Sequence, residues 1–186
     1  MSRRAMEQSL RAFLAELLAE RPPDPGLDRE ELLSETPRRV LEALLDDLLA
    51  GAGQPIHPLK PIQLAAATGP VLLDGIRFTA VCAHHLLPFR GEAHIGFVPS
   101  GYHVGLGDLA RLVDQLARRL TLQETLAAAM ADQIETSLAP RSLLVLVEAE
   151  HLCLADRGAR KKGHRFRTLE RRGVSHELLE RLLARA

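Results

Sequence analysis

The spacing of the apolar residues changes along this chain, and that change constrains the fold more than any other feature of the sequence. Residues 9–20 carry apolar side chains at helical spacing, and the sequence PPDPG then breaks the pattern. A second helix is predicted to begin with Thr36 as its N-cap and Pro37 as its first helical residue, and to end before Gly51. We therefore expect an acidic, helical N-terminal third.

The middle of the chain switches to the β-branched and aromatic alternation that is typical of strands. The elements expected after residue 70 are, in order, a strand over 71–82, a loop or hairpin over 84–91, a strand over 92–99, helices over 107–120 and 124–138, a strand over 142–155 and a short last helix over 175–186. This order predicts an α+β fold with helices packed on one face of an antiparallel sheet. We expect an N-terminal helical extension over 1–55 and a main domain over 56–186.

The overall charge excludes several classes of protein. The 186 residues include 24 Lys and Arg against 24 Asp and Glu, so nucleic acid is not an expected partner. A membrane partner is not expected either, since no run of about 20 apolar residues is present. Charged residues at Glu7, Arg11 and Glu16 interrupt any signal-peptide core, which favours a cytoplasmic protein.

One strongly charged segment lies near the C-terminus. Residues 157–172, here called the basic tail, contain eight Arg or Lys side chains and a single acid, Glu170. Charge runs of this kind are usually solvated, so we expect a basic loop. Binding of an anionic ligand is the alternative.

Both cysteines of the chain have histidine neighbours, and this pattern favours a metal site. Cys82 and His85 are separated by two residues, so a tight turn brings both to one ion. His151 and Cys153 share a face if the strand continues through them. Two thiols exclude a structural zinc site of three or four cysteines within one chain, whereas two cysteines and one histidine leave a position open for water. The alternative is that both thiols are buried core residues.

Three long stretches of the sequence, together with ETPRRV near residue 36, carry a family resemblance. They read VCAHHLLPFRGEAHIGFVPSG, VGLGDLARLVDQLARRLTLQETLAAAMADQI and VEAEHLCLADRGARKKG. In this order and spacing they resemble the GTP cyclohydrolase I family over residues 35–163. The combination of CxHH, GLxxLxRxV, QE and EHxCxxxRG is specific to that family.

The resemblance implies a fold, an activity and a cofactor. The family has the tunnelling fold, or T-fold, in which small antiparallel sheets assemble side by side into a barrel, usually as a homodecamer with active sites between subunits. Its members use Zn²⁺ to open the imidazole ring of GTP at C8. They release formate and form 7,8-dihydroneopterin triphosphate, the first intermediate of folate and biopterin synthesis. A GTP-binding homo-oligomer is therefore expected, with residues 56–186 as the catalytic domain.

The resemblance also assigns residues to the metal and to the chemistry. The zinc ligands would be Cys82, His85 and Cys153, and zinc would activate the water that attacks C8. His84 would protonate the purine nitrogen as the ring opens. His151 would act as acid and base near the ribose, and a side chain that titrates near neutrality suits both tasks.

A further set of residues would bind the substrate. Glu124 would bind the guanine edge through its carboxylate, with Gln123 beside it. Arg111 and Arg157 would hold phosphates, and Arg39 is a further candidate for that role. Two of these residues have an ordinary alternative: Glu124 as a solvated helix residue, and Arg111 in an ion pair with Asp108 or Asp114 at a spacing of three.

Two charge reversals separate this chain from the resembled family. GLGDLAR usually reads GLSKLAR, so Asp108 stands where the family has a phosphate-binding lysine, and Glu42 stands at a second such position. Three explanations stay open. The basic tail enters the pocket and restores the charge; or the chain is a paralogue acting on a purine or pterin that has no triphosphate; or it is an inactive, zinc-bound oligomeric binding protein.

Overall fold

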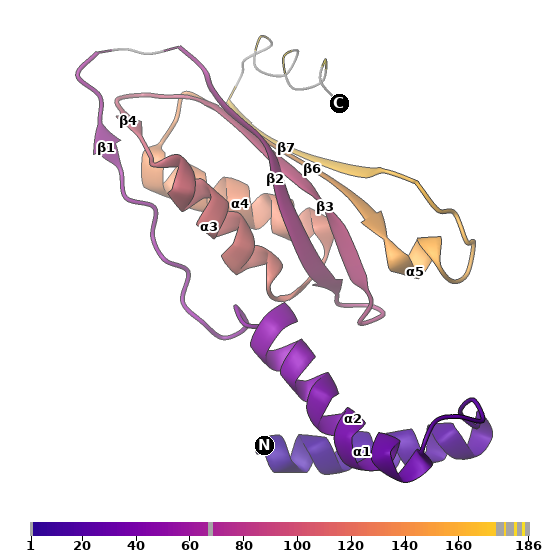
Figure 1. The fold of residues 1–186 in the computed structure, drawn as a ribbon. Coiled ribbons are helices and arrows are strands. Elements are labelled where there is room, and N and C mark those ends of the chain that lie inside the picture. The colour runs from indigo at the N-terminus through magenta and orange to yellow at the C-terminus, as the bar shows by residue number, and fades with distance from the viewer. Residues whose placement is uncertain (1, 67–68, 174–176, 178–180, 182–183, 185–186) are drawn as a thin grey trace. The chain divides into compact units, whose positions relative to one another are not determined.

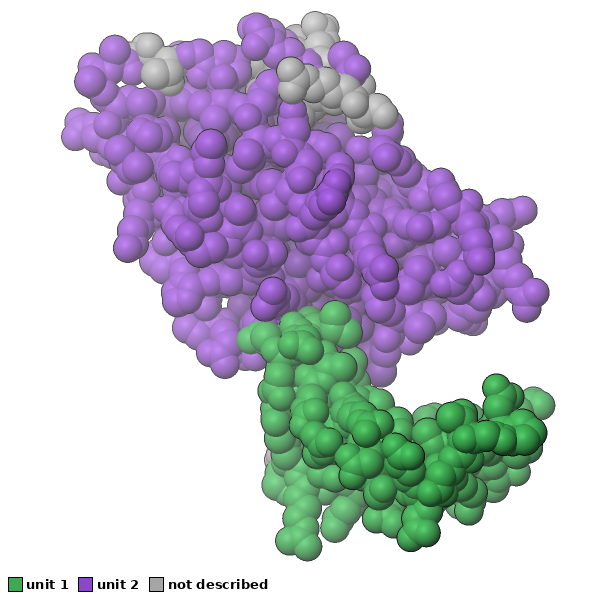
Figure 2. Space-filling model, in the orientation of Figure 1, with its two compact units in different colours: residues 1–50 green, residues 51–186 purple. Residues whose placement is uncertain are grey.

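The chain separates into two units, residues 1–50 and 51–186 (Figure 2). The computed structural model describes all residues except 1, 67–68, 174–176, 178–180, 182–183 and 185–186. The division falls close to the expected boundary between residues 55 and 56. The last helix expected over 175–186 lies largely outside the described residues.

Unit 1 is helical, as its apolar spacing predicts. It contains α1 (Arg3–Glu20), α2 (Arg29–Leu41) and the π-helix η1 (Glu42–Leu48), and α1 packs against α2. Helix α1 begins earlier than expected, because the Ser2 side chain accepts a hydrogen bond from the Ala5 amide at 3.3 Å and caps the first turn.

The predicted start of the second helix at Thr36 is wrong. Asp28 is the N-cap of α2, and its carboxylate accepts the Glu30 amide at 2.9 Å. Acidic residues in the first turn also stabilise the N-terminus of the helix dipole. Pro37 lies inside the helix, where it removes one backbone N–H but does not end the helix.

Unit 2 contains two sheets and three helices within its described residues (Figure 1). Its elements are β1 (Ile62–Gln63), β2 (Val71–Cys82), β3 (Pro88–Val98), β4 (Tyr102–His103), α3 (Leu106–Ala117), β5 (Leu120–Thr121), α4 (Gln123–Leu138), β6 (Ser142–His151), α5 (Leu152–Ala155) and β7 (Phe166–Gly173). The larger sheet has the order β5-β2-β3-β6-β7 and is antiparallel except for the short β2–β5 pair. The smaller sheet pairs β1 with β4. The α+β prediction is confirmed.

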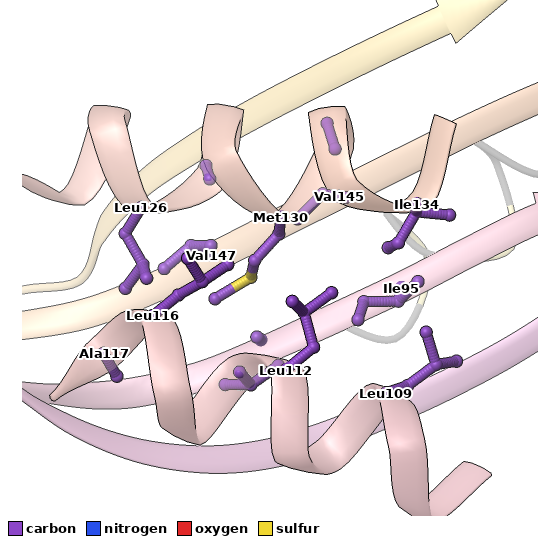
Figure 3. Packing of buried hydrophobic residues seen from close by; sticks show 14 of the residues in the cluster. Ile95, Leu109, Leu112, Leu116, Ala117, Leu126, Met130, Ile134, Val145 and Val147 are labelled. Carbon is purple, nitrogen blue, oxygen red and sulfur yellow. The ribbon is translucent and has the colours of Figure 1, made fainter. Parts of the chain in front are cut away.

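Helices α3 and α4 pack on one face of the larger sheet and enclose the core (Figure 3). In α3, Leu109, Leu112 and Leu116 recur at the spacing of one helical face, and all three are buried. The residues that meet them from α4 and the sheet include Leu126, Met130, Ile134, Ile95, Val145 and Val147. Among the described residues, no helix is long and apolar enough to cross a membrane.

Strand β3 begins at Pro88, not at residue 92 as predicted. The buried alternation extends back to Phe89, which is 0% exposed and pairs with His151 of β6. At Gly91 the two strands approach so closely that a Cβ atom would lie 1.8 Å from the Glu148 carbonyl oxygen. Glycine is therefore required at this point of the sheet.

The strand predicted over 142–155 ends at His151, and the chain then makes the helical turn α5. Cys153 lies in that turn, so the expectation that it shares a strand face with His151 is wrong. The partner strand explains the end point. The ladder reaches its last pair at Phe89 and His151, and the preceding Pro88 has no N–H to donate to a longer β6.

The expectation of a basic loop over residues 157–172 is only partly correct. Phe166–Gly173 forms β7, which pairs antiparallel with β6 along its length. This pairing gives the backbone groups on the outer side of the otherwise exposed β6 their hydrogen-bond partners. Residues 166–172 of the basic tail are therefore part of the sheet.

Candidate metal and substrate site

Cys82 is the last residue of β2, and a tight turn after it returns the chain to the same point. The Leu86 amide donates to the Cys82 carbonyl at 2.9 Å, and the Cys82 amide donates to the Leu87 carbonyl at 2.9 Å. Leu86 adopts left-handed backbone geometry, with φ 54°, to close the turn. The turn brings His85 back beside Cys82.

Cys153 joins these two residues from α5 and completes a three-residue cluster. The ligand atoms of Cys82, His85 and Cys153 all lie within 4.8 Å of one another. Burial raises the pKa of the Cys153 thiol, the neighbouring Cys82 raises it further, and the charge of Arg157 opposes this rise. Two thiol sulfurs and an imidazole are a donor set that fits zinc, and three protein ligands leave a fourth position open.

His151 lies at the end of β6, enclosed by aromatic rings. Its imidazole stacks on Phe89 with 4.6 Å between ring centroids and meets Phe166 edge-on at 5.6 Å. Burial lowers the pKa of His151, and the nearby His164 lowers it further. The neutral imidazole is therefore the favoured form of this residue.

Gln123, the first residue of α4, is hydrogen-bonded to the His151 ring. The Gln123 side chain is fully buried, and its Nε2 donates to the Val147 and Phe166 carbonyls at 2.9 Å each. Its Oε1 lies 2.9 Å from Nε2 of His151. The Gln123 amide is thus engaged inside the protein, and its predicted contact with substrate stays a prediction.

Three more of the predicted residues lie around this centre. The exposed His84 follows Cys82 in the turn, and its ring lies 6.3 Å from that of His85. Glu124 is exposed at the start of α4, and its carboxylate raises the pKa of His151, against the effect of burial. The positive charge of Arg157 lowers the pKa of the Cys153 thiol, against the effect of burial.

Two other predicted residues have acidic partners on their own helices. Arg111 is largely exposed on α3 and forms an ion pair with Asp108, three residues earlier on the same helix. Arg39 belongs to unit 1, where its guanidinium lies 4.0 Å from the Glu35 carboxylate. Phosphate binding by either arginine stays a prediction.

Three cations of the basic tail form ion pairs with acidic residues of the same chain. Arg165 and Arg167 both pair with Glu148, which lies on the face of the sheet opposite α3 and α4 and whose side chain is only 6% exposed. Lys162 lies 3.8 Å from the carboxylate of Asp156. These contacts oppose the idea that the tail restores the charge missing from a phosphate pocket.

Sequence reasoning missed two residues that touch His151. Phe166 packs against the His151 ring. The His164 ring accepts a hydrogen bond from the backbone amide of His151 at 3.2 Å. The sequence signal for them is the stretch GHRFR, in which a histidine and a phenylalanine lie two residues apart.

The fold places this chain among the T-fold proteins, and its two cysteines and one histidine form a group that could hold a metal ion. A solved structure of the archaeosine synthase QueF-Like in the apo form matches 59% of this chain and 99% of its own, with a TM-score of 0.50 and 18% identity. A likeness at this identity shows the tunnelling fold alone.

Sequence comparison identifies the family within that fold. The family model of GTP cyclohydrolase I matches residues 10–181. Relatives named GTP cyclohydrolase 1 are 40% identical over 139 residues in Bartonella bacilliformis and 41% identical over 152 residues in Thermobifida fusca. These alignments cover 73% and 81% of this chain, and 66% and 73% of the two relatives. The chain belongs to the GTP cyclohydrolase I family.

Proposed function

We propose that this protein is a zinc-dependent GTP cyclohydrolase I of the cytoplasm. It hydrolyses GTP at C8, releases formate and forms 7,8-dihydroneopterin triphosphate for folate or tetrahydrobiopterin synthesis. The observation that carries the proposal is the convergence of Cys82, His85 and Cys153, with His151 enclosed beside the same end of the sheet. Zinc bound to these three ligands supplies Lewis acidity and a water of lowered pKa.

The histidines of the site have different proton-transfer tasks in this proposal. His84 is exposed beside a metal ligand, where it delivers a proton to the purine nitrogen as the ring opens. His151 keeps a proton on Nε2 because Gln123 accepts there, so its Nδ1 is the atom that exchanges protons near the ribose. Its lowered pKa suits a group that first acts as a base.

The substrate contacts of the proposal use exposed charged side chains. Glu124 accepts hydrogen bonds from the guanine edge. The charge of Arg157 acts on Cys153, and this side chain is a proposed phosphate ligand. Arg111 and Arg39 are further proposed phosphate ligands.

The proposed protein is a homo-oligomer, and a decamer with active sites between subunits is its expected form. Strand β7 is an outer strand of the larger sheet, and it presents Phe166 and Leu169 with 42% and 37% of their surface exposed. An exposed outer strand with apolar side chains supports pairing with a second copy of the chain.

A second candidate function has its own support in the structure. Asp108 and Glu42, at the two positions where the family has phosphate lysines, engage Arg111 and Arg38 in ion pairs. This arrangement favours a paralogue that keeps the zinc chemistry but takes a purine or pterin without a triphosphate.

The deciding experiment follows two products from the zinc-loaded protein. With GTP, the first proposal expects formate together with a pterin that fluoresces after oxidation. Turnover of GMP or guanosine in place of GTP supports the paralogue. The absence of product from every purine and pterin tested contradicts both and leaves the inactive binding protein.

A further inference from the structure

His164 lies in the segment between α5 and β7, and both of its ring nitrogens are engaged by the backbone. Its Nε2 accepts the amide N–H of His151 at 3.2 Å. Its Nδ1 lies 2.6 Å from the carbonyl oxygen of Lys161. The ring thus ties the segment that precedes β7 to the last residue of β6.

These two contacts require one protonation state of the His164 ring. A backbone N–H can only donate and a carbonyl oxygen can only accept. The Nε2 atom must therefore carry a lone pair toward His151, and Nδ1 must carry the proton toward Lys161. This is the neutral Nδ1–H form. A doubly protonated ring would present an N–H to the N–H of His151, and the contact would be lost.

The His151 amide, which His164 binds, lies at the junction of β6 and α5. His151 is the last residue of β6 and the N-cap of α5, and α5 carries Cys153. No side chain caps this helix. On the other side, the His151 ring is held by Gln123 at 2.9 Å. The main chain of His151 is thus held by His164, and its side chain by Gln123.

We propose that His164 is a positioning residue for His151 and Cys153, which acts through the His151 amide and only while its own ring is neutral. Acid then releases the junction between β6 and α5. The effect on turnover rests on the function proposed above, whereas the effect on the junction does not.

Charged groups of both signs surround His164. A pocket of about 260 Å³ is lined by His164 together with Arg90, Glu92, Glu148, Glu150 and Arg165. Glu150 also accepts the Gly163 amide at 2.6 Å, which holds the residue before His164. The His151 ring lies 6.4 Å away on the other side. With acids and bases both present, the requirement for a lone pair at Nε2 is the feature that makes the contact sensitive to protonation.

The test compares hydrogen exchange at the His151 amide in the wild type, H164Q and H164A from about pH 5.5 to about pH 8. The Gln side chain has an oxygen acceptor at the reach of Nε2 but does not titrate. We expect H164Q to protect the amide at every pH. The wild type should match H164Q at high pH and exchange about tenfold faster than H164Q at low pH. H164A should exchange quickly throughout.

Comparison at equal pH removes the intrinsic pH dependence of exchange. H103Q is the matched control, because His103 lies on β4 in the smaller sheet, and it should follow the wild type. The proposal is overturned if acid affects H164Q and the wild type equally, or if H164A is as protected as the wild type. The wild-type and H164Q curves suffice even if H164A folds poorly.

A second readout is the pH profile of formate release from GTP. Between about pH 8 and about pH 5.5, the rate of formate release should fall about tenfold more in the wild type than in H164Q. Equal profiles would overturn the link to turnover. If none of the proteins releases formate, the proposed function fails, while the exchange data still test the tether.

Discussion

The Oε1 atom of Gln123 lies 2.9 Å from Nε2 of His151, and this contact assigns the proton of the His151 ring. The amide nitrogen of Gln123 faces two carbonyl oxygens, which only accept, so the orientation of the amide is unambiguous. Its oxygen must therefore be an acceptor, and His151 donates from Nε2. The free Nδ1 is the basic atom of the neutral ring.

Replacing Gln123 should damage both stability and catalysis. Gln123→Ala removes the side-chain donor to the buried Val147 carbonyl and the part-buried Phe166 carbonyl, which costs about 3 kcal/mol of unfolding free energy. The His151 ring also loses its support, so kcat should fall more than KM rises. Urea denaturation and steady-state kinetics measure the two effects. Gln133→Ala, at a partly exposed position on α4, is the control and should change stability by less than about 0.5 kcal/mol. Equal effects of the two variants would contradict this role.

The metal centre should depend on Cys153 although this residue lies far from Cys82 in sequence. Cys153→Ala removes one of three ligands, so zinc content should fall from about one ion per chain to about none. Elemental analysis measures the content, and loss of the thiolate-to-metal absorption after cobalt loading checks the ligand. His103→Ala should keep its metal. A Cys153→Ala protein that retains zinc would show that other residues form the site.

The ion pairs of Glu148 should stabilise the sheet more than those of its cross-strand neighbour Glu92. Glu148→Gln removes the buried carboxylate that Arg165 and Arg167 share and should cost about 1–3 kcal/mol. Glu92 is 42% exposed and faces Arg77, which is 87% exposed, so Glu92→Gln should cost less than about 0.5 kcal/mol. Thermal unfolding of both variants makes the comparison. A larger loss in Glu92→Gln would contradict the importance of burial.

The affinity for a negatively charged substrate should depend on Asp108. Asp108→Lys frees Arg111 and adds a cation, so KM for GTP should fall about tenfold, while KM for guanosine should not change. Asp114→Lys makes the same charge change elsewhere on α3. If both variants alter GTP binding equally, the effect is general electrostatics, and Asp108 has no special place near the triphosphate.

Much of the fold was predictable, because it depends on short-range patterns. Helical spacing located α1, α3 and α4, and alternation located β2 and most of β3 and β6. The start of α2 was missed for a local reason, the N-cap at Asp28, but the other predictions failed where a distant segment determines the outcome. Strand β6 ends at His151 because its partner strand begins at Pro88, and β7 forms because β6 offers an open edge.

The candidate site divides in the same way. The pair Cys82 and His85 follows from local spacing, because a tight turn needs no distant residue. The cysteine count also indicated Cys153, and family resemblance assigned the roles of the surrounding histidines. Neither source predicted that Gln123 would be buried behind His151 or that His164 would hold the His151 amide, since these contacts join α4, β6 and the segment before β7.

Read alone, the sequence establishes the order of the longer helices and strands as far as β6, the metal-ligating residue types and the family, because these depend on residue spacing and on short motifs. The ends of the strands, the pairing of Glu148 with the basic tail and the protonation of His151 depend on the packing of segments far apart in the chain. Hydrogen bonds between such segments require specific distances and directions, and periodicity along the chain carries no information about either.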